Sequence, residues 1–128
     1  MGLILGSEQL AALVNQPLNT LSTRRTPIKV AMLSLPPRTQ SLLEYFFANA
    51  GRASFSVAIE EQAETAIFDL DTAGSREHWG LFYGRTGKPG IALAVKPQDV
   101  PGALWVQKPV TPAALLAAAA TLQAGHLG

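Results

Sequence analysis

The sequence predicts an α/β domain built on a doubly wound, five-stranded parallel sheet with helices on both faces. Apolar runs alternate along the chain with stretches of helical periodicity, and the runs are continuous rather than alternating in polarity. Continuous apolar runs are typical of strands buried on both faces, as parallel strands are. The length of 128 residues suits one such domain with a substantial core.

The predicted strands are the five apolar runs, at residues 30–33, 53–59, 66–68, 91–95 and 104–107. Helices are predicted over residues 38–51, over residues 75–83 with Ser75 as the cap, and from Thr111 onward with Pro112 at the first helical position. Residues 60–64 have room for about one helical turn, and residues 84–90 are typical of a glycine-rich turn. The connections after the second and fourth strands are therefore too short for complete helices, so we expect two covering helices to be shortened or missing.

Three segments are predicted along the chain. Residues 1–27 form an N-terminal helix, over residues 7–18, and a linker arm; residues 28–124 form the α/β domain; residues 125–128 form a tail. The helix is predicted because apolar side chains follow Ser7 at steps of three and four residues. It is a candidate element for dimerisation by exchange between chains.

The composition excludes several functions. The chain has no cysteine, which removes disulfides and thiolate sites and favours the cytoplasm. A net charge of +1, with Arg24 and Arg25 as the single adjacent basic pair, gives no basic surface for nucleic acid. No segment resembles a signal peptide or a membrane span. The common enzyme signatures are absent, and residues 84–88 lack the spacing of a phosphate-binding loop. We therefore expect no enzyme activity and no cofactor.

Candidate functional residues follow the strands, because ligands of such sheets bind at the carboxyl ends of the strands. Asp69 follows the third strand, where an ion pair with Lys108 or with Lys96 is one interpretation of its role. Asp71 is predicted to be a helix cap or a first-turn acid. The two histidines, His78 and His126, are far apart in the sequence and are expected to be structural or solvated.

The segment from about residue 28 to residue 122 resembles the receiver domain of bacterial response regulators. Residues 68–70 followed by Gly74 match the spacing of the family's phosphoacceptor aspartate and the next glycine, and residues 29–37 match its first strand and proline. The family's switch aromatic, lysine and proline are matched by Trp105, Lys108 and Pro109. The start of its final helix is similar to residues 111–116. The resemblance implies strand order 2-1-3-4-5. It also implies a phosphoacceptor-like Asp69, a pocket of Ser34, Leu35, Ala94 and Lys108, and a switch or interface of Trp105, Pro109, Leu115 and Leu116.

The departures from the family concern the chemistry. Ser34 and Leu35 stand where receivers have the acidic pair that holds a divalent cation, and Ala94 stands where they have a serine or threonine. Because a hard cation needs carboxylate ligands, we expect no metal site. Asp69 is thus either one half of a structural ion pair or a residual phosphoacceptor. Trp105 is either a core side chain or a moving switch.

We therefore predict a pseudo-receiver, a cytoplasmic module for regulatory protein contacts and dimerisation in bacterial signalling, without metal-dependent phosphorylation. Its expected partners are a second copy, an output domain beyond Gly128 or another signalling protein, and neither nucleic acid nor membrane. One alternative is a receiver that uses Asp69 and Lys108 to accept phosphate or bind a small anion. Another is an unrelated α/β domain whose strand ends match the receiver pattern by chance.

Overall fold

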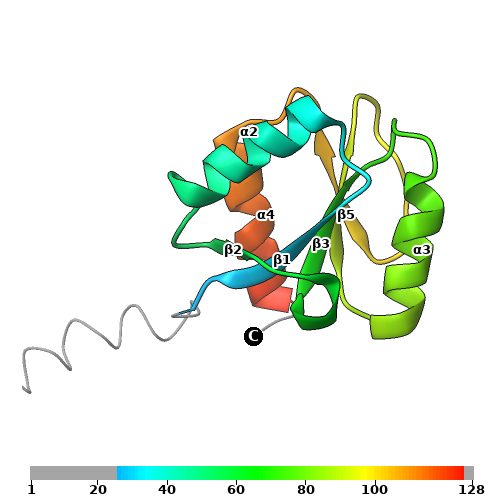
Figure 1. Cartoon of the computed structure of the whole chain (residues 1–128), viewed down its shortest axis with the longest axis horizontal. Helices are drawn as coiled ribbons and strands as arrows, with labels where there is room; N and C mark the ends of the chain where they lie inside the picture. Colours follow the sequence, from blue (N-terminus) through cyan, green and yellow to red (C-terminus); the bar gives the residue numbers. More distant parts are fainter. Residues whose placement is uncertain (1–25, 126–128) are drawn as a thin grey trace, which may run out of the picture.

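The structure, a computed structural model, describes residues 26–125 of the chain. The predicted helix over residues 7–18, nearly all of the linker arm, and His126 with the end of the tail lie outside these residues. The elements run in the order β1 (Ile28–Leu33), α2 (Pro37–Ala48), β2 (Phe55–Val57), η1 (Glu60–Gln62), β3 (Thr65–Asp69), α3 (Ser75–Thr86), β4 (Gly90–Ala94), β5 (Ala103–Gln107) and α4 (Pro112–Gly125) (Figure 1).

The predicted fold class is confirmed. All four strand pairings are parallel, and the order across the sheet is β2-β1-β3-β4-β5, that of the flavodoxin-like and receiver folds. Strands β3 and β4 lie in the middle and are buried along their whole length. This burial on both faces is the reason that their sequences are unbroken apolar runs.

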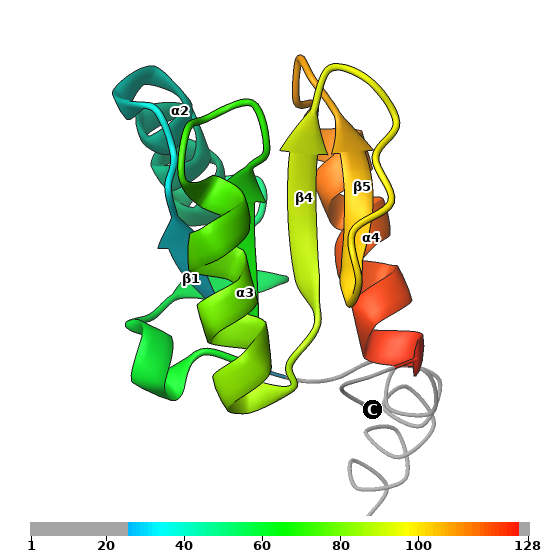
Figure 2. The same ribbon diagram turned by 90° about the vertical axis from the view of Figure 1, so that its right-hand side faces the viewer.

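Two apolar cores lie on the two faces of the sheet. Helices α2 and α4 cover one face, where residues such as Leu43, Phe47 and Leu122 pack with the strands. Helix α3 alone covers the other face, around Phe68 and Phe82. Figures 1 and 2 show this unequal cover, with α2 and α4 on one side of the sheet and α3 on the other.

The two short connections lack full helices, as the sequence predicts. A three-residue 3₁₀ turn, η1, joins β2 to β3, and no helix lies between β4 and β5. Trp79 of α3 secures the second of these connections. Its indole is stacked on Phe68 with the ring centroids 4.8 Å apart, and its Nε1 donates a hydrogen bond to the carbonyl oxygen of Pro101 at 3.1 Å. One aromatic side chain therefore helps to hold a loop that has no helix of its own.

The boundaries of α3 differ from the prediction. Ser75 is not the cap: Gly74 precedes the helix in a left-handed conformation with φ 80°, and the buried Ser75 hydroxyl caps nothing. The helix also continues through the first three residues of the predicted turn over residues 84–90 and ends at Thr86, and Gly87 follows as its C-cap with a φ of 67°. The helix extends because Phe82 packs in the core and the Thr86 hydroxyl donates to the Phe82 carbonyl oxygen at 2.8 Å.

Candidate functional site

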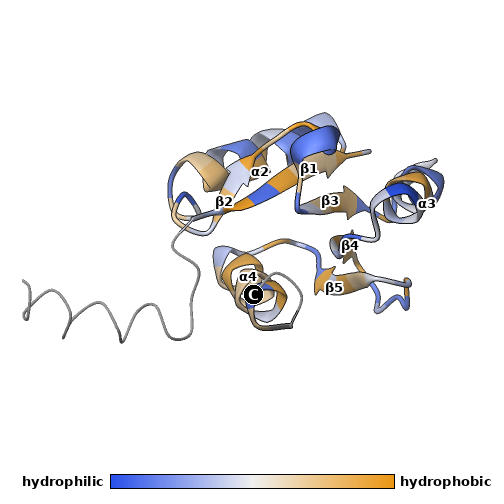
Figure 3. Cartoon of the chain, turned by 90° about the horizontal axis from the view of Figure 1, so that it is seen from below, coloured by the Kyte–Doolittle hydropathy of each residue, from blue (hydrophilic) through white to orange (hydrophobic). Residues whose placement is uncertain are grey.

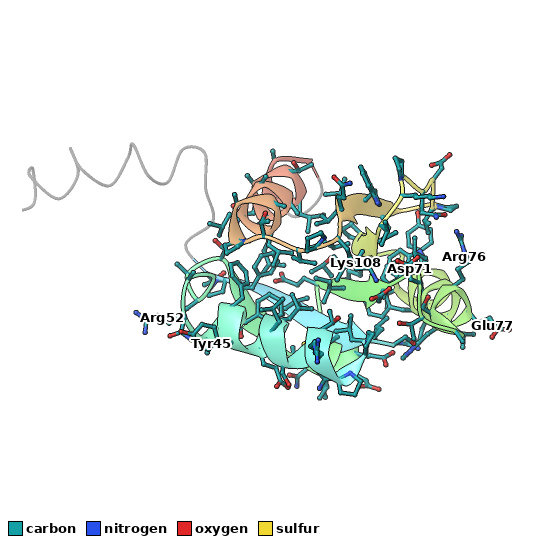
Figure 4. All side chains as sticks on the ribbon, turned by 90° about the horizontal axis from the view of Figure 1, so that it is seen from above. Tyr45, Arg52, Asp71, Arg76, Glu77 and Lys108 are labelled. Atoms are coloured by element: carbon teal, nitrogen blue, oxygen red, sulfur yellow. The ribbon has the colours of Figure 1, made fainter. Side chains whose placement is uncertain are left out.

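The register of the sheet brings the predicted pocket residues to one edge. Leu33 pairs with Phe68, Asp69 with Leu93 and Ala94 with Gln107, so these four strands end side by side. Ser34, Asp69, Ala94 and Lys108 are thus gathered at the carboxyl ends of four neighbouring strands. Figure 4 looks onto this edge and shows Lys108 beside Asp71.

Lys108 is the partner of Asp69. Its Nζ lies 3.0 Å from Oδ1 and 2.8 Å from Oδ2 of the Asp69 carboxylate, whose side chain is fully buried. The backbone N–H of Asp71 donates to the same Oδ1 at 2.8 Å. The Lys108 backbone is fixed in turn, because its N–H donates to the Ala94 carbonyl oxygen at 3.0 Å. Lys96, the other predicted partner, is exposed.

Asp71 is the second carboxylate of the site, and the prediction that it caps or begins a helix is wrong. Helix α3 begins four residues later, and the Asp71 carboxylate turns back to Lys108, with Oδ2 3.0 Å from Nζ. The same Oδ2 accepts a hydrogen bond from the Val95 N–H at 3.2 Å. We call Asp69, Asp71 and Lys108 the ion triad. One ammonium group in this triad neutralises one of two carboxylates.

The pKa values of Asp71 and Lys108 favour the charged forms of these two side chains. The hydrogen bonds from Lys108 and from the Val95 N–H hold the pKa of Asp71 below its ordinary value, against a small opposing effect of burial. Burial lowers the pKa of Lys108, but the hydrogen bonds and charges of Asp69 and Asp71 outweigh it, so the net shift is upward. Lys108 therefore stays an ammonium ion and Asp71 a carboxylate at neutral pH.

This pairing predicts an acid dependence of stability. Because the pKa of Asp71 is lower in the folded chain than the ordinary value of 3.8, its contribution is complete above that value and is lost as the pH falls through the folded-state pKa. We expect Asp71→Asn to be less stable than the parent at pH 6, and the difference to vanish in strong acid. Urea unfolding of both chains between about pH 2 and pH 7 measures it. A difference that stays constant over this range would show that the Asp71 charge contributes nothing.

The divalent cation of receivers does not fit this site. Ser34 and Leu35 supply no carboxylate, and both oxygens of Asp69 accept hydrogen bonds from the Lys108 ammonium group. In the described residues, no group of three or more acidic or histidine side chains could hold a metal ion. A cation would therefore have to displace an ammonium group that already neutralises the buried carboxylate.

His78 belongs to a second polar cluster, which the sequence does not predict. Its Nδ1 lies 3.0 Å from the Ser34 hydroxyl oxygen, and its Nε2 lies 3.0 Å from Oε2 of Glu60. The other Glu60 oxygen pairs with Arg85 at 3.1 Å. The hydrogen bond with His78, then that with Arg85, lower the pKa of Glu60 more than burial raises it. His78 is thus a structural residue that links Ser34 to Glu60, one of the two roles expected of it.

Ser34 itself is held in an unusual conformation. Its φ is 45°, and it is the one described residue other than glycine with a positive φ. Such a conformation is costly for a residue with a side chain, so the surrounding contacts must maintain it. The bond to His78 is one such contact, and it leads the Ser34 side chain toward α3 instead of leaving it free in the pocket.

The predicted switch and interface residues lie in three different places. Trp105 is half-buried and its Nε1 donates to the Ala94 carbonyl oxygen at 3.1 Å, so it packs beside the pocket. Pro109, joined to Lys108 by a cis peptide bond, is exposed, as is Leu116 at 38%. Leu115 is only 2% exposed and lies in the core between α4 and the sheet. It is therefore a packing residue in this structure and not part of a surface.

Comparison with known proteins supports the fold. No protein-family model and no curated protein matches the sequence. Among solved structures, the chain is similar to a crystal structure of a mutant of the anti-anti-sigma factor PhyR from Bartonella quintana, with a TM-score of 0.54 and 15% identity. The match covers 91% of this chain and 55% of the PhyR chain, so this chain spans about half the length of that protein. No helix in residues 26–125 has the length and hydropathy of a membrane span.

Proposed function

We propose that this chain is a pseudo-receiver, a regulatory module that acts through protein contacts and does not run metal-dependent phosphorylation. The ion triad is the observation that carries the proposal. Both oxygens of Asp69 are within 3.0 Å of the Lys108 ammonium nitrogen, and the side chain is closed to solvent. A carboxylate attacks a phosphoryl group through an oxygen that is accessible and in line, and Asp69 offers neither oxygen in this state.

The charges also argue against the alternative of a small-anion site. One ammonium and two carboxylates give the triad a net charge of −1, which repels phosphate and similar anions. Ala94 adds no hydroxyl to the pocket, and the Ser34 hydroxyl is engaged by His78. The one cation of the pocket, Lys108, is already paired with two carboxylates, and the pocket offers no free hydroxyl donor for a phosphoryl group.

The regulatory part of the proposal rests on fold. A likeness to an anti-anti-sigma factor supports a role in signalling through partner proteins. We propose a second copy, an output domain beyond residue 128 or another signalling protein as the partner, in the cytoplasm. Neither catalysis nor nucleic-acid binding is part of this function.

Treatment with acetyl phosphate and Mg²⁺ tests the proposal. Phosphorylation would add about 80 Da to the intact mass, and we expect no such species. A phosphorylatable receiver treated in parallel controls for the reagent, and Asp69→Asn controls for the site. An adduct on the parent chain that is absent from Asp69→Asn would contradict the proposal and establish the phosphoacceptor alternative.

A further inference from the structure

An apolar groove of about 340 Å³ lies between helix α2 and the start of α4. Its lining includes Leu43, Phe46 and Leu115, which are at most 6% exposed, and also Leu42 and Tyr45, which are 53% and 71% exposed. Among the described residues that line it, none is charged. Figure 3 shows α2 and α4 on the side of the sheet away from α3, with much of α4 in orange. The groove is therefore an apolar surface that is open to water.

The polar side chains of Asn49 and Thr111, which also line the groove, are bonded within their own segments. The Asn49 Nδ2 donates to the Tyr45 carbonyl oxygen at 2.8 Å, and the Thr111 hydroxyl oxygen accepts from the Ala114 N–H at 3.2 Å. The groove thus offers mainly apolar contacts. An uncharged groove between two helices suits the apolar face of a third helix.

The described chain begins beside α2, close to one end of this groove. Pro27 lines a neighbouring hollow together with Phe47 and Ala48, the last residues of α2. Asn49, which caps the C-terminal end of α2, lines the groove itself. The chain that precedes residue 26 therefore starts within a short distance of the groove.

The preceding chain is long enough to reach the groove. Twenty-five residues come before the described ones. With residues 7–18 as the helix that the sequence predicts, residues 19–25 are the linker, and seven residues span up to about 23 Å. This is about twice the diameter of a helix, so the linker can pass around the end of α2.

The other hollows in this region carry charged side chains. The hollow that Pro27 lines includes Glu44 and Arg52, and the one beside η1 includes Glu60 and Glu61. An apolar helix face packed on either hollow would remove water from these charged groups, which is costly. The groove between α2 and α4 is therefore the better surface for an apolar helix.

We propose that the occupant of this groove is the chain's own N-terminal segment, residues 7–18, which packs against α2 and α4 of the same molecule through Leu10, Val14 and Leu18. The inference goes beyond the proposed function and does not depend on it. A helix of twelve residues is marginally stable alone in water and gains its stability by packing an apolar face. The single charged residue of the segment, Glu8, lies outside this face.

The point of attachment sets the direction of the docked helix. Leu18 joins the linker, so it lies at the end of the groove near Asn49, and the segment runs parallel to α2. Both helices rise by about 1.5 Å per residue. Val14 and Tyr45, each four residues before the end of its helix, are therefore neighbours in this arrangement.

Disulfide trapping in the full 128-residue chain tests the contact, because the natural sequence has no cysteine. Mild oxidation of Val14→Cys with Tyr45→Cys should close a bond in more than about half of the molecules, since a disulfide needs Cα atoms within about 7 Å. Val14→Cys with Leu42→Cys allows for a slip of one helical turn. Ala12→Cys with Tyr45→Cys is the matched control: residue 12 is about half a turn away, on the opposite face, and should close in less than about a tenth.

The mass of the trapped product identifies the arrangement. A product with the mass of one chain supports docking within the molecule. A product of two linked chains would show exchange of the segment between copies and would overturn the proposal. Equal yields from the Val14 and Ala12 pairs, or no product from either Val14 pair, would overturn it as well.

Hydrogen exchange provides a second test in the chain without cysteines. The amides of residues 11–16 should exchange at least about tenfold more slowly than in an unfolded chain. Leu42→Asp places a charge in the groove and should remove this protection. Leu81→Asp is the matched control, because Leu81 is 70% exposed on α3, on the other face of the sheet, and it should leave the protection unchanged.

Circular dichroism checks that each variant folds, and Tyr45→Asp, at the other exposed position of the groove, replaces Leu42→Asp if that variant does not. Residues 11–16 that exchange in the parent as fast as in an unfolded chain would overturn the proposal. Protection that survives a charge in the groove would show that the segment packs elsewhere, and this result would overturn it too.

Discussion

Replacement of Lys108 by methionine is expected to lower the free energy of unfolding by about 3 kcal/mol or more. Methionine keeps most of the length of the apolar stem but removes the ammonium group. The Asp69 carboxylate, which is fully buried, would then keep one backbone hydrogen bond, from Asp71, and lose its counter-charge. An isolated buried charge is far more costly than an absent ion pair, and this difference makes the expected effect large.

Urea unfolding at pH 7 measures this effect, and two variants define its cause. Lys96→Met is the matched control, because Lys96 is exposed at the neighbouring strand end, and it should change stability by less than about 0.5 kcal/mol. The double variant Asp69→Asn with Lys108→Met should recover more than half of the loss, since no buried charge remains. A Lys108→Met chain as stable as the parent would mean that the triad does not hold this edge together.

The second large effect is a gain of metal binding. We expect Ser34→Asp together with Leu35→Asp to give the chain a divalent-cation site with a dissociation constant of about 1 mM. The register that pairs Leu33 with Phe68 sets residue 34 beside Asp69, so the new carboxylates join an existing one. Aspartate is also among the residues that best tolerate the φ of 45° at this position.

Titration of tryptophan fluorescence with Mn²⁺ or Mg²⁺ measures the gain, because Trp105 lies against the pocket through its bond to Ala94. The neutral variant Ser34→Asn with Leu35→Asn has similar shape without charge and should not respond. If the folded acidic variant also shows no response up to about 20 mM cation, the missing acidic pair is not what excludes the metal.

The fold could be predicted because its evidence is local. Each buried strand is a short apolar run in the sequence. The number of residues between consecutive runs shows that two of the connections are too short for a complete helix. The limits of α3 could not be predicted in the same way. From the sequence alone, Gly84 and Gly87 are equally good candidates for the end of the helix. The packing of Phe82 and the side-chain hydrogen bond of Thr86 extend the helix beyond Gly84, and Gly87 becomes its C-cap.

The site was predictable only where its residues leave strands directly. Asp69 ends β3 and Lys108 follows β5, so parallel topology alone brings them together. Asp71 lies two residues further on, in a loop whose path back to Lys108 depends on the Val95 N–H. In the cluster of Ser34, His78 and Glu60, His78 is 44 residues from Ser34 and 18 residues from Glu60 in the sequence. No local sequence pattern predicts such a cluster.

At the loop between β4 and β5, Trp79 makes contacts that a complete covering helix would distribute over several residues. Its indole is stacked on Phe68, lies within 5.8 Å of Phe82 and 5.2 Å of Tyr83 between ring centroids, and bonds to the loop at Pro101. Other contacts also hold this loop, since Val100 is buried in the same core and Arg76 donates to Gln98 at 2.7 Å, but Trp79 is the aromatic side chain that donates a hydrogen bond to it. Tolerance to sequence change on this face is therefore uneven: position 79 is restricted to an aromatic side chain with a donor, while the exposed Leu81 two residues away is open to almost any.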